Sequence, residues 1–127
     1  MTRVLIVAAM VVLLGTVALP GNGLKWLLEG YPFRDASLAS AGDVDEYLLV
    51  YKGGQAVHIQ AIAFAPQIEL YDGVGTLIGA GAAPPGETHI AVTMQPGGSV
   101  TNILYLYVSG SGAPAYPAQY AAWLAAP

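Results

Sequence analysis

The sequence predicts an all-β protein, a small antiparallel β-sandwich preceded by an N-terminal apolar helix. Three observations predict this fold class. Short segments of alternating apolar and polar residues recur between positions 46 and 109, clusters of glycine and proline separate them, and no helical period follows residue 30. Alternation buries one face of each strand, so closely spaced turns favour two packed antiparallel layers over a parallel sheet.

The chain divides into three parts. Residues 1–23 are expected to form a signal peptide or membrane anchor helix, residues 24–36 a linker, and residues 37–127 the sandwich domain. The apolar pattern lapses in the linker around Tyr31 and Pro32. Without the leader, roughly 100 residues remain, which suffices for one two-layer core but not for a second fold.

The leader is an uncharged run from Val4 to Leu19 that follows a single cation, Arg3. This arrangement predicts a cytoplasmic N-terminus and an extracytoplasmic domain. A helix of this length would span about 24 Å, short of a hydrocarbon core of about 30 Å. Length therefore leaves open a cleaved signal peptide, a retained anchor or a helix packed in a filament core. The expected membrane contacts are Val4, Leu5, Ile6, Val7, Val11, Val12, Leu13, Leu14 and the interfacial Trp26.

Six strands are expected in the domain, and alternation assigns their faces. In the segment Ile103–Ser109, the side chains of Leu104, Leu106 and Val108 are expected to face the core. Tyr105 and Tyr107 would then lie together on an outer surface. The tail from Ala113 to Leu124 is expected to be either a final edge strand or an arm that adds to a neighbouring subunit. The six segments are Glu46–Tyr51, Ala56–Phe64, Gln67–Tyr71, Thr76–Gly79, Thr88–Met94 and Ile103–Ser109.

Composition excludes some functions. The chain is 55% hydrophobic and only 9% charged, with eight acidic and four basic side chains. Clustered lysine or arginine is needed to bind phosphates, so nucleic acid is not an expected partner. The absence of cysteine excludes disulfides, thiolate metal sites and a cysteine nucleophile.

The order and spacing of several short motifs resemble the bacterial pre-peptidase C-terminal domain, a secreted β-sandwich family. The similarity spans about residues 37 to 122, and its motifs are Gly42-Asp43-Val44-Asp45-Glu46-Tyr47, Gly53-Gly54-Gln55, Leu70-Tyr71-Asp72, Gly75-Thr76-Leu77 and Tyr105-Leu106-Tyr107-Val108. The resemblance implies a jelly-roll-like sandwich, usually appended to secreted hydrolases, with calcium or an extracellular polymer bound in some members. Two departures are the lack of a catalytic domain and Tyr107, where the family has arginine. They favour a stand-alone surface role.

No enzymatic activity is expected. Two histidines, His58 and His89, fall on expected strands, and no Gly-x-Ser-x-Gly turn accompanies them. Two alternatives remain open. One is a hydrolytic triad of one histidine, an aspartate and either Ser99 or Ser109. The other is a copper site of both histidines and Met94, although it would lack the cysteine ligand of a blue-copper site.

Asp43 and Asp45 are the best metal candidates, because calcium prefers several carboxylate and carbonyl oxygens near a turn. Both side chains would project to one side of a strand, and Asp72 is the expected third ligand, with Glu69 as the alternative. The alternative is that these carboxylates only cap loops or accept backbone hydrogen bonds. No other cofactor is expected.

Aromatic side chains offer contact area for a partner, since their rings stack on sugars or pack at protein interfaces. The expected contact residues are Tyr105, Tyr107, Tyr116, Tyr120 and Trp123. The sequence therefore predicts an extracytoplasmic, membrane-anchored or secreted module that acts in cell-surface adhesion, assembly or accessory binding. Its expected partners are the membrane or other subunits through the N-terminal helix, and protein or polysaccharide at the cell surface. The alternative is a structural subunit of an extracellular filament or membrane complex.

Overall fold

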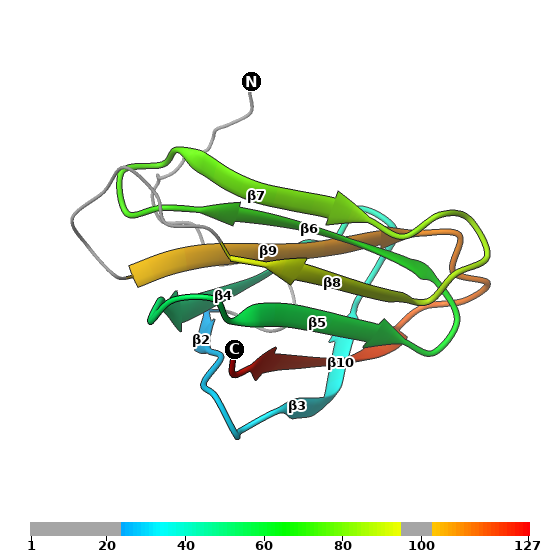
Figure 1. The fold of residues 1–127 in the computed structure, drawn as a ribbon. Helices are drawn as coiled ribbons and strands as arrows, with labels where there is room; N and C mark the ends of the chain where they lie inside the picture. The colour runs from blue at the N-terminus through cyan, green and yellow to red at the C-terminus, as the bar shows by residue number, and fades with distance from the viewer. Residues whose placement is uncertain (1–23, 95–102) are drawn as a thin grey trace.

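The computed structural model describes residues 24–94 and 103–127, which form a β-sandwich of two facing sheets (Figure 1). One sheet has the strand order β2-β4-β9-β6-β7 and the other β3-β10-β5-β8. Neighbouring strands are antiparallel except β2 and β4, which are parallel. The strands are β2 (Lys25–Trp26), β3 (Phe33–Leu38), β4 (Asp45–Val50), β5 (Ala56–Ala61), β6 (Ala65–Tyr71), β7 (Leu77–Ala82), β8 (His89–Thr93), β9 (Ile103–Ser111) and β10 (Ala118–Ala125).

The predicted sandwich is confirmed, and its core lies between the inward faces of the two sheets. Alternation along β9 buries Leu104, Leu106 and Val108 and leaves Tyr105 and Tyr107 half-buried on the outside, as the sequence predicts. The expected N-terminal helix lies outside the described residues. The largest fully buried apolar side chains come from both sheets, and they are Leu27, Leu38, Tyr47, Leu49, Val57, Ile59, Ile68, Leu70, Met94, Leu106 and Tyr120.

Two expectations about strand boundaries need correction. The stretch 24–36 is not only a linker, because it supplies β2 and the first part of β3, one to each sheet. Leu27 follows β2, is fully buried, and donates its backbone N–H to the carbonyl of Leu48 at 2.9 Å. The tail is neither an edge strand nor an arm: β10 lies between β3 and β5 and pairs with both.

The turn between β4 and β5 is held by a buried glutamine. Gly53 and Gly54 both have positive φ, 114° and 72°, which glycine adopts without a steric penalty. The Gln55 side chain is fully buried, and its Oε1 accepts the backbone N–H groups of Lys52 at 2.9 Å and Gly53 at 3.0 Å. Its Nε2 donates to Glu29 Oε1 at 2.9 Å, so the turn is tied to the segment that follows β2.

At one point of the core, a side chain packs directly against a strand backbone. Gly110 lies opposite Pro66 in the pairing of β9 with β6, and a Cβ at Gly110 would lie 2.3 Å from Cδ2 of the buried Phe64 ring. Only glycine therefore fits at this position unless the ring moves.

We predict that Gly110→Ala lowers the free energy of unfolding by about 1–3 kcal/mol, because the added methyl group overpacks the core against Phe64. Urea denaturation of the full-length chain measures the change. Gly42→Ala is the matched control, since a Cβ there would meet nothing within 4 Å, and its effect should stay within about 0.5 kcal/mol. Equal effects of the two substitutions would contradict this packing.

Candidate functional site

An aromatic row crosses the outer face of the five-stranded sheet. The row is defined by the pairing of neighbouring strands. Each of its residues is the Cα partner of the next residue on the adjacent strand, across the sheet from β2 to β7. Four strand spacings of about 4.8 Å make it about 19 Å long. The two end residues are the most exposed, Trp26 at 47% and Leu77 at 50%. The members of the aromatic row, in spatial order, are Trp26, Leu48, Tyr105, Tyr71 and Leu77.

An acidic row of Glu46, Tyr107 and Glu69 runs beside the aromatic row, one step further along the same strands. The Tyr71 hydroxyl donates to Glu69 Oε1 at 3.0 Å, and the Tyr71 and Tyr107 rings meet edge to face at 5.5 Å. An open hollow of about 540 Å³ is lined by two members of this row, Tyr107 and Glu69, and by Gln67. The face therefore combines flat aromatic area with carboxylates that accept hydrogen bonds.

Partial burial changes the acid–base properties of the acidic row. It raises the pKa of Glu46, and the hydrogen bond from Tyr107 offsets part of this effect. Burial also raises the pKa of Tyr107, and the neighbouring Glu46 carboxylate raises it further. The Tyr107 hydroxyl therefore remains a hydrogen-bond donor at neutral pH.

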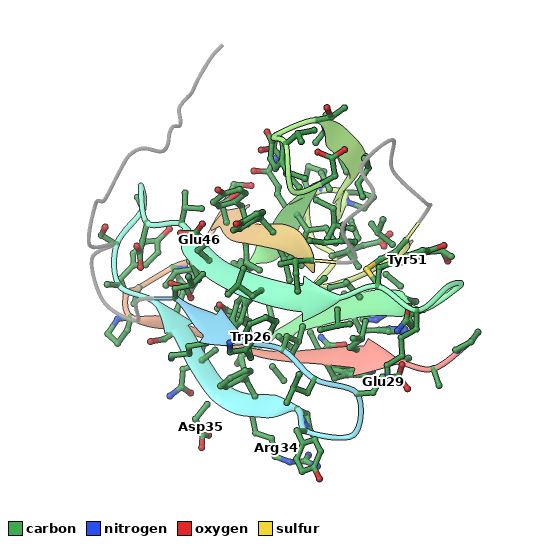
Figure 2. The ribbon with its side chains drawn as sticks, turned by 90° about the vertical axis from the view of Figure 1, so that its left-hand side faces the viewer. Trp26, Glu29, Arg34, Asp35, Glu46 and Tyr51 are labelled. Atoms are coloured by element: carbon green, nitrogen blue, oxygen red, sulfur yellow. The ribbon has the colours of Figure 1, made fainter. Side chains whose placement is uncertain are left out.

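Figure 2 shows the side of the molecule on which the aromatic row begins. Trp26 lies on β2 near the middle of this side, Glu46 lies on β4, and Arg34 and Asp35 lie on β3, in the other sheet. Four apolar side chains close to the N-terminal boundary of the described residues are exposed, and they are Leu24, Trp26, Leu28 and Tyr31.

A hydrogen-bond chain joins the two sheets inside the core. Tyr120 of β10 donates its hydroxyl proton to Asp45 Oδ2 of β4, so Tyr47 must donate in the 2.7 Å contact between the two tyrosine hydroxyls. All three side chains are at most 2% exposed. Burial raises the pKa of Tyr47 to about 12, and burial and the neighbouring Tyr47 also raise the pKa of Tyr120.

The three carboxylates expected to hold calcium do not meet. Asp45 is opposite Val108 of β9. Asp72 comes one residue after Tyr71, which pairs with Tyr105, so the levels of Asp45 and Asp72 along β9 differ by about 13 Å. Within residues 24–94 and 103–127, no three histidine or acidic side chains are close enough to share a metal ion. The sequence pattern placed Asp43 and Asp45 on one face but carried no information about the position of Asp72.

Asp43 and Asp72 instead hold loops. Asp43 Oδ2 accepts the backbone N–H of Ala39 at 2.7 Å. Asp72 Oδ1 accepts the N–H groups of Val74 at 3.0 Å and Thr76 at 2.9 Å and so closes the turn between β6 and β7. The second oxygen of each carboxylate is buried and has no hydrogen-bond partner among the described residues.

The outer face of the four-stranded sheet carries the two histidines and the second tryptophan. His58 is the Cα partner of Trp123 on β10, and their rings stack with centroids 4.9 Å apart and an interplanar angle of 6°. His58 Nδ1 lies 3.1 Å from His89 Nε2 on β8. Burial lowers the pKa of His58, and the charge of His89 lowers it further.

The expected partner-contact residues are distributed over different environments. Tyr105 and Tyr107 lie on one outer face and Trp123 on the opposite one. Tyr120 is 1% exposed in the core and cannot contact a partner of the folded domain, and Tyr116 is half-buried against the core. Except for Gln119, both faces of β10 are apolar, so its alternation was a weak guide to which of Tyr120 and Trp123 points inward.

The expected membrane contacts lie outside the described residues, except Trp26, which the structure places on β2. Residues 24–94 and 103–127 include no helix with the length and hydrophobicity needed to span a bilayer.

The alternative histidine sites are not formed. Ser109 lies on β9, in the sheet opposite the histidines, and donates to Gln67 Oε1 at 3.5 Å. Ser99 lies outside the described residues. Met94 is buried in the core, whereas His58 and His89 lie on an outer face, so the three do not form a copper site.

The sequence analysis did not identify four members of the aromatic row, which are Trp26, Leu48, Tyr71 and Leu77. The outward orientation of Tyr71 was evident from alternation, but its alignment with the others depends on strand order, which alternation does not encode.

Comparison with solved structures supports the fold. The chain is similar, with a TM-score of 0.58 and 13% sequence identity, to the crystal structure of the pre-peptidase C-terminal domain of collagenase from Bacillus anthracis. The match covers 82% of this chain and 96% of that chain. No family model and no curated protein matches the sequence. The structural match confirms the resemblance to the pre-peptidase C-terminal domain, and at this identity it establishes the fold alone.

We predict that Tyr120→Phe lowers the free energy of unfolding by about 1–3 kcal/mol, because Asp45 and Tyr47 lose a buried hydrogen-bond partner. Tyr31→Phe removes a hydroxyl from a side chain that is 73% exposed and should change stability by less than about 0.5 kcal/mol. Urea denaturation of both variants measures the difference. A Tyr120→Phe protein as stable as its Tyr31→Phe counterpart would show that the chain of hydroxyls does not stabilise the fold.

We also predict a loss of stability at high pH. The pKa of Tyr47 is about 12 in the folded chain against about 10 when unfolded, so the folded state binds this proton more tightly. The stabilisation is complete below about pH 10 and is lost as pH rises toward 12. Tyrosinate absorbance should therefore rise together with loss of near-ultraviolet circular dichroism for the buried tyrosines. Full ionisation of all eight tyrosines in a still-folded chain would contradict the burial of Tyr47 and Tyr120.

Proposed function

We propose that this chain, which has the fold of a pre-peptidase C-terminal domain, is an exported, membrane-tethered and non-catalytic binding module of the cell surface. It would serve in adhesion, assembly or as an accessory to other surface proteins. The single observation that carries the proposal is the aromatic row across the outer face of the five-stranded sheet.

The aromatic row suits an extended ligand that lies across the strands. Trp26 and Tyr105 are two strand spacings apart, about 9.6 Å, so successive units of a polymer can stack on successive rings. The sheet backbone fixes the positions of these rings, so little conformational entropy is lost on binding. The neighbouring acidic row supplies hydrogen-bond acceptors and favours a neutral or basic ligand, such as a polysaccharide or a protein fibre.

The proposed tether is the apolar run from Val4 to Leu19, which four residues separate from the first described residue. Trp26 follows this run closely in sequence, so a retained anchor would place one end of the aromatic row near the membrane surface. Exposed Leu24 and Leu28 and the interfacial preference of tryptophan are consistent with that position.

The non-catalytic part of the proposal is supported by the partners of the two histidines. His58 and His89 contact each other and Trp123, and the described serine considered as a nucleophile lies on the other sheet. Among residues 24–94 and 103–127, the hydrogen-bond and ring contacts of these imidazoles are with each other and with Trp123, not with the serine hydroxyl and carboxylate that a hydrolytic triad needs.

A filament or membrane-complex subunit is the second candidate, favoured by the exposed apolar residues near β2. These residues come soon after the apolar N-terminal run in sequence, and a neighbouring copy would cover them if that run packed against itself; they are Leu24, Trp26, Leu28 and Tyr31. Intact mass of the protein from cells, with electron microscopy of the cell surface, distinguishes the candidates. A mature chain that lacks the first 18 to 23 residues would exclude both the tether and the filament.

We predict that Trp26→Ala and Tyr105→Ala each weaken binding to an insoluble polymer about tenfold or more, as expected for aromatic contact residues. Cosedimentation of the full-length chain with purified peptidoglycan and with fibrillar collagen tests a polysaccharide and a protein ligand. Ile62→Ala is the matched control, because Ile62 is 71% exposed and lies outside the row. Binding that survives both row substitutions, or that Ile62→Ala weakens equally, would contradict the proposed surface.

A further inference from the structure

The fold brings the only two histidines of the chain into direct contact. His58 and His89 are 31 residues apart in sequence and lie on the neighbouring strands β5 and β8. His58 is the Cα partner of Ala91, so His89 is its diagonal neighbour on the same outer face. Diagonal neighbours on a sheet are close enough for ring side chains to touch.

The two imidazoles present nitrogen atoms to one another. His58 Nδ1 and His89 Nε2 are 3.1 Å apart, and the ring centroids are 5.3 Å apart. Two neutral imidazoles at this distance share one proton, donated by one nitrogen to the lone pair of the other. If the donor ring changes tautomer and carries this proton on its other nitrogen, both facing nitrogens present a lone pair to the space between the rings.

We propose that His58 Nδ1 and His89 Nε2 form a two-histidine site for a divalent transition-metal ion such as Zn²⁺, Cu²⁺ or Ni²⁺. The ion takes the place of the shared proton, which moves by way of solvent to the other nitrogen of the donor ring, so that both imidazoles stay neutral and each facing nitrogen donates its lone pair to the metal. Water completes the coordination, because His89 is exposed and His58 is only partly buried.

The observed distance fits this coordination. Metal–nitrogen bonds of about 2.0–2.1 Å to two nitrogens 3.1 Å apart correspond to an angle of about 95–100° at the metal. This angle lies between the square-planar value of about 90° and the tetrahedral value of about 109°, so rotations of a few degrees suffice for either geometry.

Trp123 holds the site in place. Its indole stacks on the His58 ring at 4.9 Å and lies 6.2 Å from the His89 ring, so both imidazoles pack against one rigid surface. A ring that is already oriented loses less conformational entropy when it binds a ligand.

The three strands around the histidine pair offer no charged side chain that would repel the ion or form an ion pair with a histidine. Strands β5, β8 and β10 carry no aspartate, glutamate, lysine or arginine. The nearby Gln60 is engaged with Thr88, to which its Nε2 donates at 2.9 Å.

Trp123 also provides a direct readout, because Cu²⁺ bound to His58 quenches the fluorescence of the stacked indole. The chain has two tryptophans, so a Trp26→Phe background leaves Trp123 as the only indole emitter. The experiment titrates Cu²⁺ into the full-length chain, prepared without a polyhistidine tag, and follows Trp123 emission. Zn²⁺ titration by calorimetry gives the stoichiometry independently. We expect saturable quenching and one ion per chain.

His58→Gln and His89→Gln should each lower the affinity for Cu²⁺ and for Zn²⁺ about tenfold or more, because a single imidazole remains to bind the ion. Thr93→Val is the matched control on the same face of β8 and should leave the affinity unchanged. Thermal unfolding confirms that each variant is folded, which is expected because the substituted side chains lie on the outer face. Metal binding that tolerates the loss of either histidine, or the absence of saturable quenching, would show that the pair is only a hydrogen-bonded surface contact.

Discussion

The hydroxyl of Tyr120 connects the two layers of the sandwich, and the arrangement of both outer faces depends on it. Tyr47 and Asp45 belong to β4 in one sheet, and Tyr120 belongs to β10 in the other. Buried polar groups are stable only when they are hydrogen-bonded, so this chain of donors permits one alignment of the two strands. A slip of β10 by one residue would expose the Tyr120 hydroxyl and leave Asp45 buried without it.

The alignment fixed in the core determines what each outer face presents. With Tyr47 inward, Leu48 points outward and joins Trp26 and Tyr105 in the aromatic row. With Tyr120 inward, Trp123 points outward and stacks on His58. One buried contact thus sets a face with carboxylates and flat aromatic area on one sheet, and a face with two imidazoles and an indole on the other. This division explains how a chain with 9% charged residues still carries two chemically distinct surfaces.

Local sequence patterns were sufficient for the fold class, the main strands and the outward placement of Tyr105 and Tyr107. They were insufficient wherever the outcome depends on strand order. The strand β2 has only two residues and a parallel partner distant in sequence, so its segment resembled a linker. The contact of His58 with His89 and the separation of Asp72 from Asp45 depend on which strands are neighbours. Burial of Tyr120 was hidden because each face of β10 carries a large aromatic side chain among alanines, Tyr120 on one face and Trp123 on the other.

The most direct test of this account is a nuclear Overhauser measurement of the aromatic side chains in the full-length protein. With two histidines and two tryptophans, the relevant signals can be assigned from single substitutions. The account predicts cross-peaks between the Trp123 indole and the His58 imidazole, together with cross-peaks between the Tyr47 and Tyr120 rings. Cross-peaks from Trp123 to core leucine and valine methyl groups, with Tyr120 exposed to solvent, would contradict it.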